Sequence, residues 1–245
     1  MRCSVVMATC NGERFLREQL TSLASQTRLP DELIVCDDAS NDRTLDILTE
    51  FAVSAPFPVR VTARPSRLGV KDNFTDALQR ATGEVVFICD QDDVWLPSKI
   101  ERSLREFARH GVHAVATDAV ICDEELRRVG PTIANAAGLS NGSCNAYTRQ
   151  FLHLALPVPD TPTSYDGWLY SLSRWMKVRA DVREVHQLWR RHDTAVSGWK
   201  QSPLRRRLRL PGQLQRLERL VVHVDSAKRL RLLNREIANL DVISE

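Results

Sequence analysis

Apolar and polar residues follow two alternating patterns along the first half of the chain. Short apolar runs, which indicate buried strands, occupy Cys3–Ala8, Leu33–Cys36, Val59–Ala63, Val85–Cys89 and Val112–Thr117. Between these runs apolar residues recur at helical spacing, which predicts helices over segments that include 12–25, 45–51, 72–81 and 98–107. Strands that alternate with helices are typical of a parallel sheet with crossover helices. The pattern therefore predicts an α/β fold with a mostly parallel central sheet flanked by helices.

The second half of the chain is less regular. Glycine, asparagine, serine and alanine predict a loop over 131–143, and apolar spacing predicts helices over Ala146–Leu154 and Asp166–Trp175. Leucines and valines also recur at helical spacing over Gln213–Val224, where they are interleaved with arginines. We expect this last segment to belong to a basic, amphipathic helical extension.

Charge is distributed unevenly along the chain. The 245 residues are 43% hydrophobic and 27% charged, which is typical of a soluble globular protein. The net charge is +3, and residues 200–245 alone carry 11 lysines and arginines against 5 acidic residues. By default such a basic helix presents a solvated face. The alternative is a helix that binds an anionic membrane surface.

Cysteine usage and the lengths of the apolar runs bear on the cellular compartment. The six cysteines form no CxxC pair and no zinc-type spacing. No signal peptide precedes the first predicted strand, and no apolar run approaches the roughly 20 residues that span a bilayer. We therefore expect a cytoplasmic protein, with peripheral attachment to the inner face of the membrane if the basic extension binds there.

The most informative segment is Asp90-Gln91-Asp92-Asp93, which follows directly on the predicted strand Val85–Cys89. Open α/β sheets bind their ligands at the carboxyl ends of the strands, and this segment lies at such an end. Neighbouring carboxylates repel one another unless they share a cation, and oxygen ligands suit Mg²⁺ or Mn²⁺ that carries substrate phosphates. A solvated acidic loop or a helix N-cap is the alternative interpretation.

Two further predicted strands end in polar residues that would reach the same edge of the sheet. The first is followed by Thr9-Cys10-Asn11-Gly12-Glu13 and the second by Asp37-Asp38. No GxGxxG follows the first strand and no GxxxxGK[ST] occurs, which argues against a glycine-rich phosphate loop. The pattern instead favours a nucleotide site built from side chains and a metal ion.

Several motifs, in a fixed order along the chain, carry a family resemblance. They are Ser4-Val5-Val6-Met7-Ala8-Thr9-Cys10-Asn11-Gly12, Ser25-Gln26-Thr27, ELIVCDDAS at 32–40, Gly69-Val70-Lys71-Asp72-Asn73-Phe74 and CDQDDVWLP at 89–97. These segments resemble family-2 inverting glycosyltransferases of the GT-A fold, and the last one resembles the bacterial rhamnosyltransferase-like branch. The resemblance covers residues 3–120 strongly and continues more weakly to Gly198. It implies a GT-A type α/β fold.

The resemblance also implies a set of residues that bind the nucleotide sugar. By position they are Thr9, Asn11, Glu13, Asp38, Lys71, Asn73, Asp90, Asp92 and Arg191. In that family pattern, Asp38 would hold the base and Asp90 would contact the ribose or the metal. Asp92 would be the direct carboxylate ligand of Mn²⁺ or Mg²⁺.

Inversion at the sugar carbon requires a general base for the acceptor hydroxyl, and the family supplies it from the start of a later helix. Tyr165-Asp166-Gly167-Trp168 is the matching stretch, which makes Asp166 the implied base; capping of that helix is the alternative role, and the two are compatible. Residues 189–198 resemble the arginine–histidine loop of the branch. This match makes His192 a metal ligand and places Arg190 or Arg191 near the leaving group.

Taken with the resemblance, these features predict a metal-dependent, inverting hexosyltransferase. It would move a hexose or deoxyhexose from a UDP- or dTDP-linked sugar to a saccharide or lipid-linked acceptor, in cell-surface polysaccharide or glycolipid synthesis. The implied organisation is a nucleotide-sugar-binding half (1–110), an acceptor-binding half (111–199) and the basic helical extension (200–245). No nucleic-acid partner is expected. The alternatives are a metal-dependent phosphohydrolase and a non-catalytic polyanion-binding protein with the same fold.

Overall fold

The computed structural model describes residues 1–133, 141–159 and 164–195. The helix expected at Gln213–Val224, and with it the basic extension, lies outside the described residues. Within the part of the chain that is described, no helix is both long enough and apolar enough to cross a membrane.

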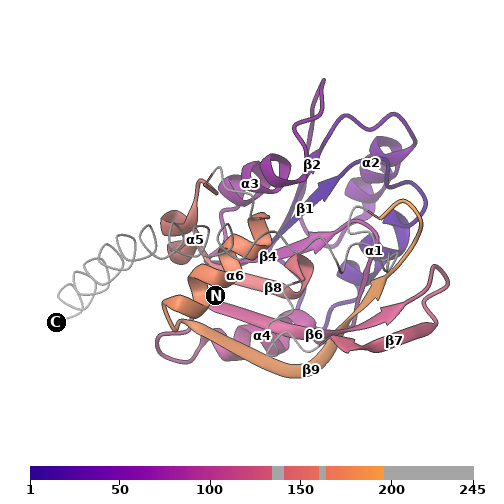
Figure 1. The fold of residues 1–245 in the computed structure, drawn as a ribbon. Helices are drawn as coiled ribbons and strands as arrows, with labels where there is room; N and C mark the ends of the chain where they lie inside the picture. The colour runs from indigo at the N-terminus through magenta and orange to yellow at the C-terminus, as the bar shows by residue number, and fades with distance from the viewer. Residues whose placement is uncertain (134–140, 160–163, 196–245) are drawn as a thin grey trace, which may run out of the picture.

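A nine-stranded sheet forms the centre of the described part, in the order β3-β2-β1-β4-β8-β6-β9-β5, with β7 paired to β6 (Figure 1). The strands are β1 (Cys3–Thr9), β2 (Glu32–Asp37), β3 (Val59–Ala63), β4 (Val85–Asp90), β5 (Val94–Trp95), β6 (Ala114–Cys122), β7 (Arg128–Ile133), β8 (Asn145–Thr148) and β9 (Arg179–Arg190). Strands β1 to β4 pair in parallel, as the sequence predicts. Strand β8 runs antiparallel between β4 and β6 and joins the two halves of the sheet, and β6 pairs in parallel with β9.

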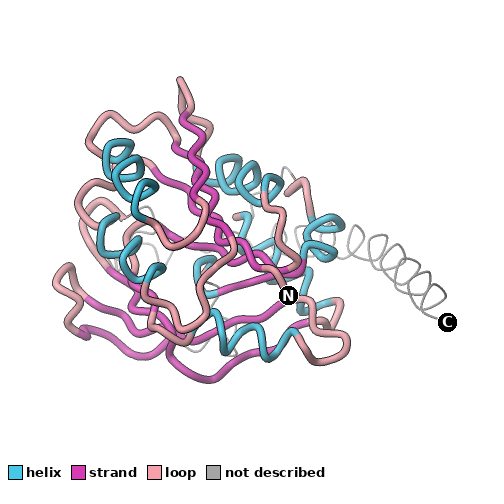
Figure 2. The backbone as a smooth tube through the Cα atoms, turned by 180° about the vertical axis from the view of Figure 1, so that it is seen from behind, coloured by secondary structure: helices cyan, strands magenta, loops and turns pink. Residues whose placement is uncertain are grey.

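Helices cover both faces of this sheet (Figures 1 and 2). They are α1 (Leu16–Ala24), α2 (Thr44–Ser54), α3 (Val70–Arg80), α4 (Lys99–Phe107), α5 (Arg149–Ala155) and α6 (Tyr165–Trp175), with a 3₁₀ turn, η2, at Gly142–Cys144. One apolar core packs α1, α2 and α4 against the sheet, and the other packs α3, α5 and α6. The molecule is therefore a three-layer α/β sandwich.

Strand β1 shows why the strands of the first half could be predicted from the sequence. Val5 and Met7 belong to the core beneath α1 and α2, whereas Val6 belongs to the core beneath α3. Successive side chains of a strand point to opposite faces, so a strand covered on both faces is apolar at every position. The same holds for β2 and β4, whose residues are almost all buried.

The second half departs from the prediction in three places. Strand β7 spans Arg128–Ile133 and so enters the segment where a loop is predicted from residue 131. Strand β8 begins at Asn145, where apolar spacing predicts a helix from Ala146, and α5 begins only at Arg149. The Thr148 hydroxyl caps α5 by accepting the Phe151 N–H at 3.2 Å. The long strand β9 was not predicted.

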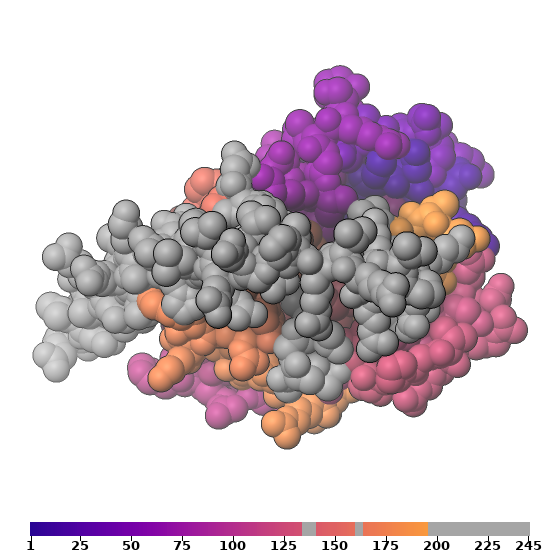
Figure 3. All heavy atoms as spheres, in the orientation of Figure 1, coloured from indigo at the N-terminus to yellow at the C-terminus, as the bar shows by residue number. Residues whose placement is uncertain are grey.

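In the space-filling view, the N-terminal segments (indigo to purple) fill the upper part of the face, and β7 and β9 (pink and orange) lie in the lower part (Figure 3).

Candidate active site at the carboxyl edge of the sheet

The carboxyl ends of β1, β2 and β4 bring predicted site residues side by side, and we call this region the carboxyl edge. The parallel register places Thr9 beside Asp37 on one side and Ala8 beside Asp90 on the other. Thr9 is buried, and its hydroxyl donates to Asp37 Oδ1 at 2.8 Å. Thr9 therefore orients the Asp37 carboxylate at the carboxyl edge.

Asp38 is buried and holds the loop that precedes α3. Its Oδ1 accepts the Leu68 N–H at 2.6 Å, and its Oδ2 accepts the Gly69 N–H at 2.9 Å. Gly69 has φ of +86°, a conformation that favours glycine. Each carboxylate oxygen has capacity for a further hydrogen bond, so Asp38 can both position this loop and accept a donor from a ligand.

The loop after β1 is tied to the loop after β2. The Asn11 side-chain oxygen accepts the Asn41 N–H at 2.9 Å, and Glu13 Oε2 accepts the Arg43 N–H at 2.9 Å. Asn11 has φ of +49°, in the left-handed region that asparagine tolerates. These two side chains therefore shape the exposed wall of the carboxyl edge.

Residues of α3 approach the same region from the other side. Lys71 Nζ lies 3.8 Å from Asp72 Oδ1 in the first turn of the helix. Asn73 is buried, and its amide donates to the Cys36 carbonyl at 2.7 Å, close to the end of β2. Asn73 thus supports β2 from behind, and Lys71 is partly exposed beside it.

Gln91 was not singled out by the sequence, yet it fixes the acidic segment to β1. Its Oε1 accepts the Cys10 N–H at 2.9 Å, and its Nε2 donates to the Cys10 carbonyl at 3.1 Å. A Cβ on Gly12 would lie 2.5 Å from Gln91 Oε1. Glycine at position 12 therefore permits the close approach that joins the two strand ends.

The acidic segment gathers three carboxylates. Oxygen atoms of Asp90, Asp92 and Asp93 all lie within 4.8 Å of one another. Burial, reinforced by the nearby charge of Asp92, raises the pKa of the Asp90 carboxyl. Such crowding of acidic groups in a low-dielectric position is favourable only when positive charge or hydrogen-bond donors compensate for it.

Asp93 obtains its compensation from the protein. It is fully buried, and its Oδ1 accepts the Arg190 N–H at 3.0 Å. Its Oδ2 accepts the Ser143 hydroxyl at 3.0 Å and the Gln187 amide at 2.5 Å. Asp93 therefore faces β9 and η2, which leaves Asp90 and Asp92 as the carboxylates available at the carboxyl edge.

His192 lies directly against Asp92. Its Nε2 is 2.8 Å from Asp92 Oδ2, and its ring packs 4.7 Å from that of Phe15, measured between centroids. The predicted pair of metal ligands, although 100 residues apart in sequence, is thus in contact. A carboxylate oxygen and an imidazole nitrogen are suitable donors for Mn²⁺ or Mg²⁺, so these residues fit a divalent cation.

The two arginines before His192 have different places. Arg190 is buried, stacks 4.5 Å from the centroid of Phe15 and donates from Nε to the Asp92 carbonyl at 2.8 Å. Arg191 stacks on Trp189 at 4.4 Å, and burial lowers the pKa of its guanidinium, although Asp93 and Asp92 oppose this shift. Arg190 therefore anchors the acidic loop, and Arg191 lies within electrostatic reach of both carboxylates.

Asp166 lies in the first turn of α6, as predicted, but it is not the N-cap of that helix. Ser164 is the N-cap, with its hydroxyl accepting the Gly167 N–H at 3.3 Å, and Asp166 Oδ1 accepts the same N–H at 2.9 Å. The Asp166 carboxylate contributes to the raised pKa of Asp90. The implied base and the acidic segment therefore belong to one electrostatic site.

The turn η2 packs tightly against the start of α6. A Cβ on Gly142 would lie 2.6 Å from the Tyr165 hydroxyl oxygen and 3.1 Å from Asp166 Cβ. Tyr165 is buried and stacks on Phe74 with centroids 4.6 Å apart, so its ring has little room to withdraw. Gly142 thus allows Asp166 to sit next to η2.

Gly142→Ala is expected to destabilise the protein and displace Asp166. Overpacking of this kind costs about 1–3 kcal/mol, which lowers Tm by roughly 2–10 °C in a chain of this size. Thermal unfolding measures the loss, and Tyr165→Phe in the same chain should recover part of it by removing the closest atom. An unchanged Tm in Gly142→Ala would show that the contact is looser than the structure indicates.

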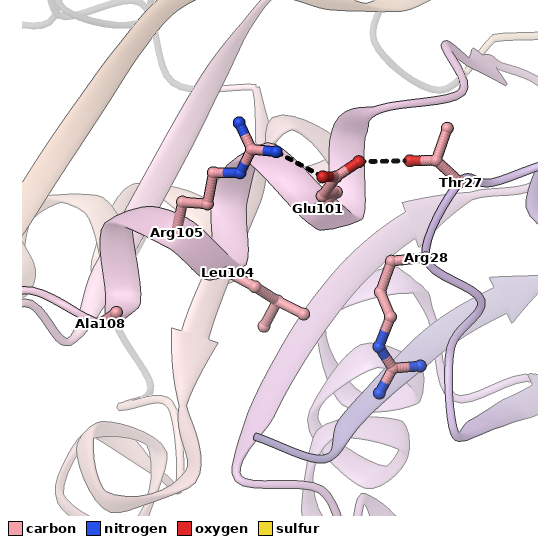
Figure 4. Close-up of a pocket in the computed structure, with 6 residues that line it drawn as sticks. All are labelled: Thr27, Arg28, Glu101, Leu104, Arg105 and Ala108. Atoms are coloured by element: carbon pink, nitrogen blue, oxygen red, sulfur yellow. Dashed lines mark hydrogen bonds and ion pairs between the residues drawn. The ribbon is translucent and has the colours of Figure 1, made fainter.

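A separate surface hollow lies away from this site (Figure 4). It is lined by Thr27, Arg28, Glu101, Leu104, Arg105 and Ala108. Thr27 and Arg28 precede β2, at its amino end, so the hollow lies away from the carboxyl edge. Glu101 accepts the Thr27 hydroxyl at 2.8 Å and pairs with Arg105 (Figure 4). Arg28 pairs with Asp31 at 2.7 Å.

Comparison with known proteins agrees with this geometry. Residues 4–160, more than half of the chain, match the model of glycosyl transferase family 2. The chain is 34% identical over 102 residues to dTDP-rhamnosyl transferase RfbG of Shigella flexneri. The aligned segment covers 40% of this chain and 35% of that protein. The chain spans less than two thirds of the length of the curated relatives that match it first.

Two solved structures show the same fold. The first, S. aureus TarS residues 1–349 in complex with UDP, has a TM-score of 0.65 at 19% identity and covers 78% of this chain and 61% of that one. The second is the mannosyltransferase PcManGT of Pyrobaculum calidifontis in complex with GDP-Man and Mn²⁺. It has a TM-score of 0.62 at 19% identity and covers 98% of this chain and 75% of that one.

The described part of the chain thus has the GT-A type of fold. The chain belongs to glycosyl transferase family 2. The predicted family and the predicted α/β fold are therefore confirmed.

Proposed function

We propose that this protein is an inverting, metal-dependent hexosyltransferase that uses a nucleoside diphosphate sugar. The observation that carries the proposal is the contact of His192 Nε2 with Asp92 Oδ2 at 2.8 Å, at the carboxyl edge that also holds Asp38 and Asp90. Asp92 and His192 suit a divalent cation that carries a diphosphate. Asp38, which holds the loop before α3, lies at the same edge of the sheet. The Asp166 carboxylate, whose charge helps to raise the pKa of Asp90, would supply the general base for the acceptor hydroxyl.

Each residue has a distinct task in this proposal. Asp38 orients the base through the loop it already holds, and Asp90 accepts a hydrogen bond from the ribose. Asp92 and His192 hold the divalent cation, which would stabilise negative charge on the departing diphosphate. Asp166 removes the proton of the acceptor hydroxyl, while Arg191 adds positive charge near the leaving group.

Similar proteins support a nucleotide-sugar donor: they include a dTDP-rhamnosyl transferase and structures in complex with UDP and with GDP-Man. We propose a UDP- or dTDP-linked hexose or deoxyhexose as donor and a saccharide or lipid-linked hydroxyl as acceptor. The product would enter cell-surface polysaccharide or glycolipid. We also propose a cytoplasmic location with peripheral contact to an anionic membrane through residues 200–245.

A ligand panel tests the core of the proposal. UDP, dTDP, GDP and CDP are each added with and without Mn²⁺, and thermal unfolding is followed. One diphosphate is expected to stabilise the protein only when Mn²⁺ is present, by about 2.7 kcal/mol at one hundred times its Kd. The matching sugar donor is then supplied with and without acceptor mixtures. Stabilisation by none of the four, or turnover that is pure hydrolysis whatever acceptor is present, would contradict the transferase proposal.

A further inference from the structure

A buried polar cluster lies directly beneath the acidic segment, and the proposed mechanism does not use it. Lys99, in the first turn of α4, is 1% exposed. Its Nζ donates to the Ser143 carbonyl at 2.7 Å and to Gln187 Oε1 at 2.5 Å. The same ammonium lies 3.9 Å from the centroid of the Trp95 ring. One cation therefore joins α4, η2, β5 and β9.

The partners of Lys99 are also the partners of Asp93. The Ser143 hydroxyl and the Gln187 amide both donate to Asp93 Oδ2, and Gln187 Nε2 also donates to Ser143 Oγ at 2.7 Å. Lys99, Gln187, Ser143 and Asp93, which we call the buried cluster, thus form a closed ring of hydrogen bonds. A cation at one side of the ring balances the carboxylate at the other.

The Gln187 amide fits this ring in one orientation. Gln187 accepts from Lys99 through its oxygen and donates to Asp93 through its nitrogen, so its amide has a single orientation. Burial lowers the pKa of Lys99 to about 8, and the charge of nearby Asp93 opposes this shift. A buried ionic group is costly, and a fully satisfied network of this kind holds the attached segments in one arrangement.

The buried cluster connects the two halves of the proposed site. Asp93 is adjacent in sequence to Asp92, the proposed metal ligand, and Ser143 is adjacent to Gly142, which packs against Asp166. The ring therefore sets how far the donor-side carboxylate lies from the acceptor-side carboxylate.

Resting on the proposed function, we propose that the buried cluster is a positioning device for transfer and that Lys99 is the residue on which it depends. Lys99 touches neither ligand; it acts through Asp93 on Asp92 and through Ser143 on Asp166. Loss of Lys99 would change the placement of Asp166 relative to Asp92 more than it changes the donor side or the acceptor side alone.

The experiment compares Lys99→Met with the wild-type protein. Three quantities are measured: the Kd of Mn²⁺ with UDP or dTDP by calorimetry, the rate of donor hydrolysis, and kcat for transfer. We expect Kd and hydrolysis to change by less than ~3-fold, because each needs only the donor side. Transfer is expected to fall by ~50-fold or more, because it needs both halves in register.

Two further variants separate positioning from stability. Ser143→Ala keeps the carbonyl that Lys99 binds and removes the hydroxyl, which joins Asp93, Gln187 and Asn141. It should fold and lose transfer by ~10-fold with hydrolysis unchanged. Lys177→Met, at an exposed lysine, is the matched control and should behave as wild type. Lys99→Arg, which restores the charge and the donors, should recover part of the lost transfer.

Other outcomes would overturn the proposal in recognisable ways. A parallel fall of binding, hydrolysis and transfer in Lys99→Met and Ser143→Ala would assign the cluster to stability alone. Wild-type transfer in Ser143→Ala and Lys99→Met would show that the cluster does not position the site, while the proposed function would stand. No transfer and no metal-dependent diphosphate binding in the unaltered protein would instead remove the proposed function itself.

Discussion

Replacing Asp92 by Ala is expected to abolish Mn²⁺-dependent binding of the nucleoside diphosphate and to lower kcat/KM for transfer by at least ~1000-fold. A Lewis-acid cation stabilises developing charge by several kcal/mol, and each 1.4 kcal/mol is about tenfold in rate. Asp92 is the carboxylate in contact with His192, whereas Asp93 is committed to β9. Among the described residues, removing Asp92 therefore leaves no carboxylate hydrogen-bonded to that imidazole.

Calorimetric titration of Mn²⁺ into the protein with the diphosphate, followed by initial transfer rates, measures both effects. Asp46→Ala provides a control, because the Asp46 side chain is 70% exposed on α2 and its ion-pair partner is Arg43, which has no proposed role in the site. Asp92→Asn keeps the size of the side chain and removes only its charge, so it should resemble Asp92→Ala in metal binding. Retention of metal-dependent binding in both Asp92 variants would place the cation elsewhere.

The fold of the first half follows from the sequence largely because β1, β2 and β4 are covered on both faces. Val85–Cys89, for example, is apolar at every position, and a short run of this kind between turn signals predicts a buried strand of a parallel sheet. Chain order and parallel pairing then bring the ends of β1, β2 and β4 together. The residues of the carboxyl edge could therefore be named before the structure was known.

Strands β8 and β9 could not be predicted for the opposite reason. Strand β9 is only partly buried and carries Arg179, Asp181, Arg183 and Glu184, so its sequence lacks both an apolar run and clear alternation. Strand β8 spans Asn145–Thr148 and is held by partners on both sides that lie far away in the chain. Tertiary pairing decides the structure of such short or charged segments, and local patterns do not record it.

The same limit applies to the residues around the site. A lysine is expected at the surface from sequence alone. Lys99 is buried because Ser143 of η2 and Gln187 of β9 accept hydrogen bonds from its ammonium group. The family resemblance gave roles to Asp90 and Asp92 and none to Asp93. The contact of Asp93 with β9 could not be predicted, because that strand was itself not predicted. For Lys99, the available signal in the sequence was a polar residue among the apolar positions of α4.

Asp166→Asn is expected to lower kcat for transfer by at least ~100-fold and to leave donor binding within ~3-fold of wild type. Proton transfer by a positioned base contributes about 10²–10⁴-fold to a rate, and an amide cannot take that role. The substitution should not disturb α6, because asparagine keeps the Oδ1 that accepts the Gly167 N–H at 2.9 Å. Calorimetry with Mn²⁺ and the diphosphate measures binding, and single-turnover transfer measures the chemical step.

Ser164→Ala separates the two roles that the start of α6 combines. Ser164 is the N-cap, so its loss costs about 1 kcal/mol of stability and should leave kcat near wild type. If Asp166 acted only as a helix-terminal anion, both variants would lower Tm and neither would lower kcat. If Asp166 instead belonged to the donor pocket, Asp166→Asn would weaken diphosphate binding. A loss of kcat with intact binding and intact Tm is therefore the pattern expected if Asp166 is the general base, and neither a helix-terminal anion nor a donor-pocket residue produces it.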